Sequence, residues 1–260
     1  MRRNFVPALA LALAVTACSG GGTSAPTSIP QSTSIPGSAS APPSPVTGTA
    51  TATTNAPSGP TSFGYVPLWP FASVAAAEQW QREALQAGHQ PWRLDAGEVA
   101  VAFARQYLGF VEIDRVVRKT ITATDAQVAV GYTVEGTSGT AAVIHLVRIG
   151  SGTGQPWEVV GTDDSATFSL RRPSYGSAVA GTVIVGGHIA GVDESIRVSA
   201  RQLSGVVGGY CCLPAGAPTS WSVRLPLTRT QPGPVTIVAS TGGHVAAVER
   251  FTITGVRSGP

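Results

Sequence analysis

The sequence is poor in the residues from which metal and catalytic sites are usually built. It has three cysteines, four histidines and one lysine, and 12% of its residues are charged. Closely spaced histidine pairs, a Gly-x-Ser-x-Gly elbow, a Ser-x-x-Lys motif and a Walker-type phosphate loop are all missing. We therefore expect no metal, no cofactor and no catalytic residues.

Clustered positive charge is missing as well. The formal net charge is +3 at pH 7, but Arg2 and Arg3 belong to a segment that we expect to be cleaved off. The other arginines and Lys119 are scattered along the chain. Proteins that bind nucleic acid group their cations to neutralise several phosphates, so we expect no nucleic-acid binding.

The N-terminus has the layout of an export signal. Arg2 and Arg3 precede the apolar residues 5–14, which are too few to span a bilayer, since about 20 are needed. Val15, two small residues and Cys18 follow and resemble a bacterial lipobox. The resemblance implies cleavage before Cys18 and a diacylglycerol on its sulfur, which anchors the protein to the outer face of the cell membrane. The alternative is an ordinary signal peptide over residues 1–17, cleaved after Ala17.

Residues 18–61 have a composition of their own. They are rich in Ser, Thr, Pro, Gly and Ala and contain no charged side chain. Such a segment cannot bury enough apolar surface to offset the loss of chain entropy. We therefore expect a lipid-anchored, disordered linker between the membrane and the folded part of the chain.

Residues 62–171 are expected to form an α+β domain. Aromatic residues crowd between Phe63 and Phe71 and predict an extended arm that packs on this domain. One helix is predicted over 73–87, with Ser73 as its N-cap. A second helix is predicted to begin at Asp95, with Glu98 at the spacing of a capping box, and to end at a glycine, residue 109.

Beyond the helices the apolar residues alternate, which predicts antiparallel strands over 127–135, 141–149 and 157–161, with a turn over 135–139. The order of two helices and then consecutive strands is similar to the cystatin-like, nuclear-transport-factor-like cone fold. The resemblance covers about residues 72–170. It implies that a ligand pocket can exist between helix and sheet.

Residues 172–260 are expected to contain strands only. Short apolar runs separated by Gly/Pro turns occur at 181–186, 195–200, 221–225, 235–239 and 247–256. This spacing is typical of a β-sandwich.

The start of this region resembles the immunoglobulin-like domain of bacterial spore-germination proteins. Pro173, Gly176 and Val179 match the opening of that family, Gly-Thr-Val-Ile-Val-Gly-Gly follows over 181–187, and Trp221 begins the aromatic-led strand. The resemblance covers roughly 172–257 and implies an adhesion or assembly module without catalytic residues.

Three sets of polar residues are candidates for chemistry. His188 lies near Asp193 and Glu194 in sequence, but both His188 and His244 follow Gly-Gly, so we favour turn positions over metal ligands. The adjacent carboxylates Asp163 and Asp164 follow a predicted strand, and we interpret them as part of a solvated turn. An enzyme would need several ionisable groups to converge in a cleft of the α+β domain, and the candidates for that are Asp95, Glu98, Glu112, Asp114 and His145.

The adjacent cysteines Cys211 and Cys212 are the most unusual local feature. An exported protein can form disulfides, and neighbouring cysteines can close only a strained ring. We expect such a vicinal disulfide in a loop. Two free thiols and a link to another chain are the alternatives.

These features favour a non-catalytic surface protein that binds or assembles with an envelope protein or a cell-wall component. An envelope enzyme or small-ligand binder with a site in the α+β domain is the second hypothesis. A thiol redox sensor built on Cys211 and Cys212 is the third.

The N-terminus of the mature protein tests the predicted anchor. We expect it to be Cys18 carrying the mass of a diacylglycerol thioether, because that is the modification that the lipobox implies. Mass spectrometry of the protein purified from its native membrane measures this. A free, unmodified N-terminus downstream of Cys18 would contradict the prediction.

Overall fold

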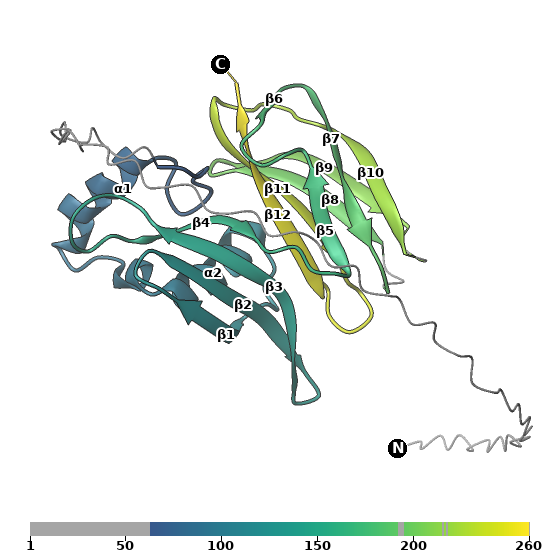
Figure 1. The fold of residues 1–260 in the computed structure, drawn as a ribbon, viewed down its shortest axis with the longest axis horizontal. Helices are drawn as coiled ribbons and strands as arrows, with labels where there is room; N and C mark the ends of the chain where they lie inside the picture. The colour runs from purple at the N-terminus through teal and green to yellow at the C-terminus, as the bar shows by residue number, and fades with distance from the viewer. Residues whose placement is uncertain (1–62, 192–194, 215, 217, 260) are drawn as a thin grey trace, which may run out of the picture. The chain divides into compact units, whose positions relative to one another are not determined.

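The computed structural model describes residues 63–191, 195–214, 216 and 218–259 (Figure 1). These residues belong to one compact unit, which spans Pro57–Pro260. The predicted signal peptide, the lipidation site Cys18, the linker, and the carboxylates Asp193 and Glu194 lie outside the described residues.

The first predicted helix is confirmed. It begins as α1 (Val74–Trp80) and continues as a wider π-helical turn, η1 (Gln81–Leu85). The Ser73 hydroxyl caps it by accepting a hydrogen bond from the backbone N–H of Ala76 at 3.2 Å. Gly88, with φ +73°, redirects the chain after the helix.

The second predicted helix is confirmed as well. A short 3₁₀ turn, η2 (Pro91–Leu94), leads into α2 (Ala96–Ala102), which continues as the π-helical segment η3 (Phe103–Leu108). Asp95 Oδ1 accepts from the N–H groups of Gly97 and Glu98, at 2.7 and 3.0 Å. The capping box is not completed, because the N–H of Asp95 donates to the Trp92 carbonyl instead.

Four antiparallel strands form a meander in the order β1-β2-β3-β4, with α2 lying across one face of the sheet (Figure 1). The turn between the second and third strands is shorter than predicted. Glu135 and Gly136 both have positive φ, and this two-residue turn suits the twist of a hairpin. The strands are β1 (Arg115–Ile121), β2 (Asp125–Val134), β3 (Thr137–Arg148) and β4 (Trp157–Thr162).

The remaining strands form two sheets that enclose a shared apolar core. The three-stranded sheet has the order β10-β7-β5 and the five-stranded sheet the order β6-β12-β11-β8-β9. All pairs are antiparallel except β6 with β12. The strands are β5 (Phe168–Arg172), β6 (Ala178–Val179), β7 (Thr182–Ile189), β8 (Ile196–Gln202), β9 (Gly205–Leu213), β10 (Thr219–Pro226), β11 (Gly233–Thr241) and β12 (Arg250–Ser258).

All five strands predicted in this region are present, and β5, β6 and β9 are additional. The prediction of a loop at Cys211 and Cys212 is wrong, because both cysteines lie in β9, which pairs with β8. Strand β5 crosses the domain boundary predicted at residues 171–172, and the boundary itself stays a prediction.

The predicted extended arm is present over residues 63–71. The N–H of Leu68 donates to the carbonyl of Val159 at 3.0 Å, and the N–H of Val159 donates to the carbonyl of Trp69 at 2.7 Å. The arm therefore adds to the outer edge of β4. On its other side the N–H of Val66 donates to the Tyr175 hydroxyl at 2.8 Å. A Cβ atom on Gly255 of β12 would lie 2.9 Å from Leu68, so the glycine makes room for the arm.

The α+β sheet and the five-stranded sheet also share buried side chains. Val238, Phe251 and Ile253 of β11 and β12 pack in the same apolar cluster as Phe103 of η3. The hydroxyl groups of Tyr107 and Thr236 are hydrogen-bonded at 3.1 Å inside this contact.

A buried carboxyl group, that of Glu158, binds the last residue of the arm, Phe71. Glu158 of β4 is fully buried, and its Oε2 accepts a hydrogen bond from the N–H of Phe71 at 3.1 Å. Its Oε1 has no hydrogen-bond partner among the described residues. Burial raises the pKa of Glu158 well above its usual range, although the backbone N–H groups of the arm and the charge of Arg93 act in the opposite direction. The guanidinium of Arg93 itself lies 4.7 Å from the ring centre of Phe71.

Replacement of Glu158 by glutamine tests this burial. A glutamate whose pKa is raised by folding stabilises the protein below its unfolded pKa of about 4.3 and loses that contribution as the pH rises. We expect Glu158→Gln to remove this loss and to stabilise the protein near pH 8 by roughly 1–3 kcal/mol, with little effect at pH 4. Thermal unfolding across this pH range measures it.

Glu249→Gln is the matched control, because it is expected to have the opposite sign. Burial acts to raise the pKa of Glu249, but hydrogen bonds from backbone N–H groups, led by that of Val245, lower it overall. Its glutamine variant should lose stability near neutral pH and not at pH 3. A Glu158→Gln protein that unfolds with the same pH dependence as the parent would contradict the account of Glu158.

Candidate functional site

A groove lies between the second helix and the edge strand β1. Its volume is about 830 Å³, within the range of sites that hold small ligands. The lining combines apolar side chains with charges of both signs. It consists of Trp92, Asp95, Gly97, Glu98, Val101, Ala102, Arg105, Gln106, Val111, Asp114, Arg115, Val116 and Lys119.

Gly97 sets how closely the two walls of the groove approach. A Cβ atom at this position would lie 3.0 Å from Asp95 Oδ1 and 3.1 Å from Cγ2 of Val116. A larger residue would therefore require the side chain of Asp95 or Val116 to shift by a few tenths of an ångström. Asp95, as the N-cap, fixes the start of the helix at the same place.

The charges of the groove are arranged in pairs. Lys119 Nζ lies 3.7 Å from Asp95 Oδ2, and Arg115 Nε lies 2.8 Å from Asp114 Oδ1. All four side chains are more than 40% exposed, so each pair contributes at most about 1 kcal/mol. The pairs place opposite charges side by side along the groove and add little to stability.

Asp95 and Asp114 both have a pKa below the usual value for aspartate, so both carboxylates are ionised at neutral pH. The hydrogen bond from Arg115 lowers the pKa of Asp114. Burial acts to raise the pKa of Asp95, but the N–H groups of Glu98 and Gly97 and the charge of Lys119 lower it overall. Neither group is held protonated, as a general acid would be.

The structure brings together three of the five residues that we proposed for a catalytic cleft. Asp95, Glu98 and Asp114 line the groove, whereas Glu112 and His145 do not. Glu112 accepts a hydrogen bond from the N–H of Ala247 at 2.7 Å. His145 lies in β3 and borders a second cavity of about 510 Å³. Its Nε2 is 3.4 Å from Asp125 Oδ1, and Asp125 does not line that cavity.

The other candidates do not line the groove. His188 lies in β7, not in a turn, and its backbone N–H donates to the hydroxyl of Ser169 at 3.2 Å. His244 does lie in a turn, between β11 and β12. There the Glu249 carboxylate accepts a hydrogen bond from the backbone N–H of His244 at 3.0 Å. Asp164 accepts the N–H of Leu170 at 3.1 Å. Among the described residues no three histidine, cysteine or acidic side chains lie close enough together to hold a metal ion.

The basic and aromatic residues of the groove were not predicted from the sequence. Arg105 comes from the second helix, Trp92 from η2, and Arg115 and Lys119 from a strand that had not been predicted. The local signal was the sequence Arg-Val-Val-Arg-Lys over 115–119, in which three cations flank two adjacent valines.

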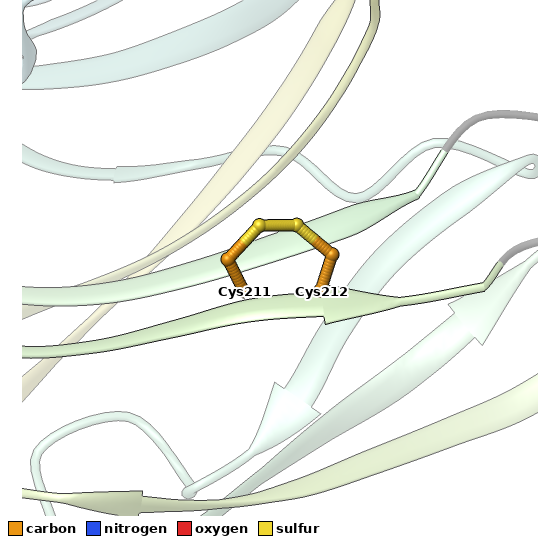
Figure 2. The surroundings of a disulfide bond; sticks show 2 residues. All are labelled: Cys211 and Cys212. Atoms are coloured by element: carbon orange, nitrogen blue, oxygen red, sulfur yellow. A yellow bond between two sulfur atoms is a disulfide. The ribbon is translucent and has the colours of Figure 1, made fainter.

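A disulfide joins Cys211 and Cys212 and projects from β9 (Figure 2). Strand β9 is an edge strand of the five-stranded sheet, and Cys211 is exposed there. The cysteines lie about 90 residues beyond the last groove residue in the sequence, and they do not line the groove.

Within the described residues, no helix has the length and apolar character needed to cross a membrane. Comparisons with protein-family models, with curated proteins and with solved structures found no match for this chain.

Proposed function

We propose that this chain is a lipid-anchored, extracytoplasmic binding protein that holds an extended peptide segment of an envelope protein in the groove beside β1. The observation that carries the proposal is that the groove runs along an edge strand. Strand β1 is the outermost strand of its sheet, and all seven of its residues are exposed. Such a strand offers backbone N–H and C=O groups to which a peptide can add as a further strand.

The side chains beside this edge suit a peptide. Val116 and Val111 offer apolar contacts, and the neighbouring charges of both signs, such as Lys119 and Glu98, offer partners for polar peptide side chains. Pairing of β1 with a second copy of itself is disfavoured. An antiparallel pair centred on Arg118 would place two like charges directly opposite each other.

The rest of the proposal follows the sequence. A lipid on Cys18 would keep the protein at the outer face of the cell membrane, and residues 18–61 would act as the linker. The shared core of the two C-terminal sheets supports the proposal that residues 172–260 form an immunoglobulin-like interaction module.

An envelope enzyme is the second candidate, and the meeting of Asp95, Glu98 and Asp114 in one groove favours it. Two observations favour binding instead. Asp95 and Asp114 are ionised and already engaged by basic partners. No histidine, cysteine or serine of the described residues lines the groove to serve as base or nucleophile.

Filling the groove tests the proposal. Ala102 lies on its helical wall, so Ala102→Trp should block it and lower the capture of the partner by roughly tenfold or more. The measurement is cross-linking of the full-length protein in its native envelope, followed by quantification of each linked protein.

Ala87→Trp adds the same bulk at an exposed position after the first helix and serves as the control. A protein that is captured by the parent and by Ala87→Trp, and lost with Ala102→Trp, supports the proposal. Equal capture by all three, with all three folded, contradicts it.

A further inference from the structure

The outer face of the three-stranded sheet brings together cationic residues that are far apart in the sequence, namely Arg171 and Arg172 of β5 and Arg224 of β10. On β10 the core-facing residues Trp221, Val223 and Leu225 are buried, so the residues between them face outward. The strand register places Ser220 opposite His188 and Ser222 opposite Gly186. On the other side of β7, Gly186 is also opposite Arg172 of β5.

This face is hollowed at its centre. A cavity of about 300 Å³ lies over Gly186 and Gly187, and the polar side chains that line it are Arg171, Arg172, His188, Ser220 and Ser222. The backbones of the neighbouring strands approach both glycines closely. A Cβ atom on Gly186 would lie 2.6 Å from the carbonyl oxygen of Trp221, and one on Gly187 would lie 1.8 Å from that of Ser169.

The arginines around the hollow form no ion pair in the described part of the chain. The three ion pairs found there involve other residues, and neither Arg171 nor Arg172 makes a side-chain hydrogen bond. Arg224 follows Ser222 on the same outward face, opposite Ile184, and is exposed. The hollow is thus lined by donors, because guanidinium groups and serine hydroxyls can all donate hydrogen bonds.

We propose that this hollow binds a phosphate group of an anionic ligand, a site distinct from the groove beside β1. Arg171 and Arg172 both line the hollow, and a guanidinium group can donate two parallel N–H groups to phosphate oxygens. The serine hydroxyls opposite them can donate to the remaining oxygens. The size of the cavity suits one phosphate ester, and the few cations that surround it are too few for a stretch of nucleic acid. The ligand is a phosphate ester, either soluble or the headgroup of a lipid.

The test uses the full-length protein in neutral detergent micelles, with NMR detection of the Trp221 indole and the His188 imidazole. One arm adds inorganic phosphate or glycerol 3-phosphate. The other adds micelles that contain phosphatidylglycerol, with phosphatidylcholine as the neutral comparison. We expect saturable binding in at least one arm, and binding that Arg171→Gln/Arg172→Gln weakens by roughly tenfold or more.

The matched control is Arg197→Gln/Arg229→Gln, which removes the same charge elsewhere. Arg197 lies in β8 of the other sheet, and Arg229 lies beyond the far end of β10. Ser220→Ala/Ser222→Ala removes donors without changing charge and should weaken binding by a smaller factor. Thermal unfolding confirms that each variant is folded.

The outcomes separate the sources of the ligand. Saturable binding of the soluble phosphates supports a soluble ester, and binding of phosphatidylglycerol alone supports a lipid headgroup. Equal binding of sulfate, which would indicate an adventitious ion only, overturns the proposal. So does equal weakening by the control pair, a strong preference for an oligonucleotide, or no binding in either arm.

Discussion

The hydrogen bonds between the arm and β4 are the contact on which the rest of the structure depends. Leu68 and Trp69 exchange backbone hydrogen bonds with Val159, and the Glu158 carboxyl accepts the N–H of Phe71 just beyond them. The arm covers the outer edge of β4 in this way, so that this strand is buried on an edge that would otherwise be open. Tyr175, which binds Val66, extends the same contact to the C-terminal sheets.

The arm also determines the position of the groove. The ring of Trp69 stacks on Trp92 with 5.7 Å between centres, and the indole N–H of Trp157 donates to the carbonyl of Leu94 at 3.1 Å. These contacts fix the η2 turn, and the Asp95 cap that follows it fixes the start of α2. One wall of the groove is therefore held by Trp69 of the arm and Trp157 of β4, while the other wall is the exposed strand β1.

Local signals in the sequence predicted the helices and most strands. A helix cap such as Ser73 or Asp95 acts within a few residues, and so does the alternation of apolar residues that marks a strand. They did not predict β9, where three glycines and the cysteine pair leave little alternation of apolar residues. The two proposed sites were out of reach for a different reason. The groove combines a helix with a strand, and the anion site combines residues from β5, β7 and β10, so each exists only through tertiary pairing.

Hydrogen exchange at the Leu68 amide tests the central role of the arm most directly. If the arm belongs to the cooperative core, the amides of Leu68 and Val159 should exchange at similar, slow rates, because both would open only when the unit unfolds. Exchange of the Leu68 amide at the rate of an unstructured peptide, with the amides of β2 and β3 still protected, would contradict the account.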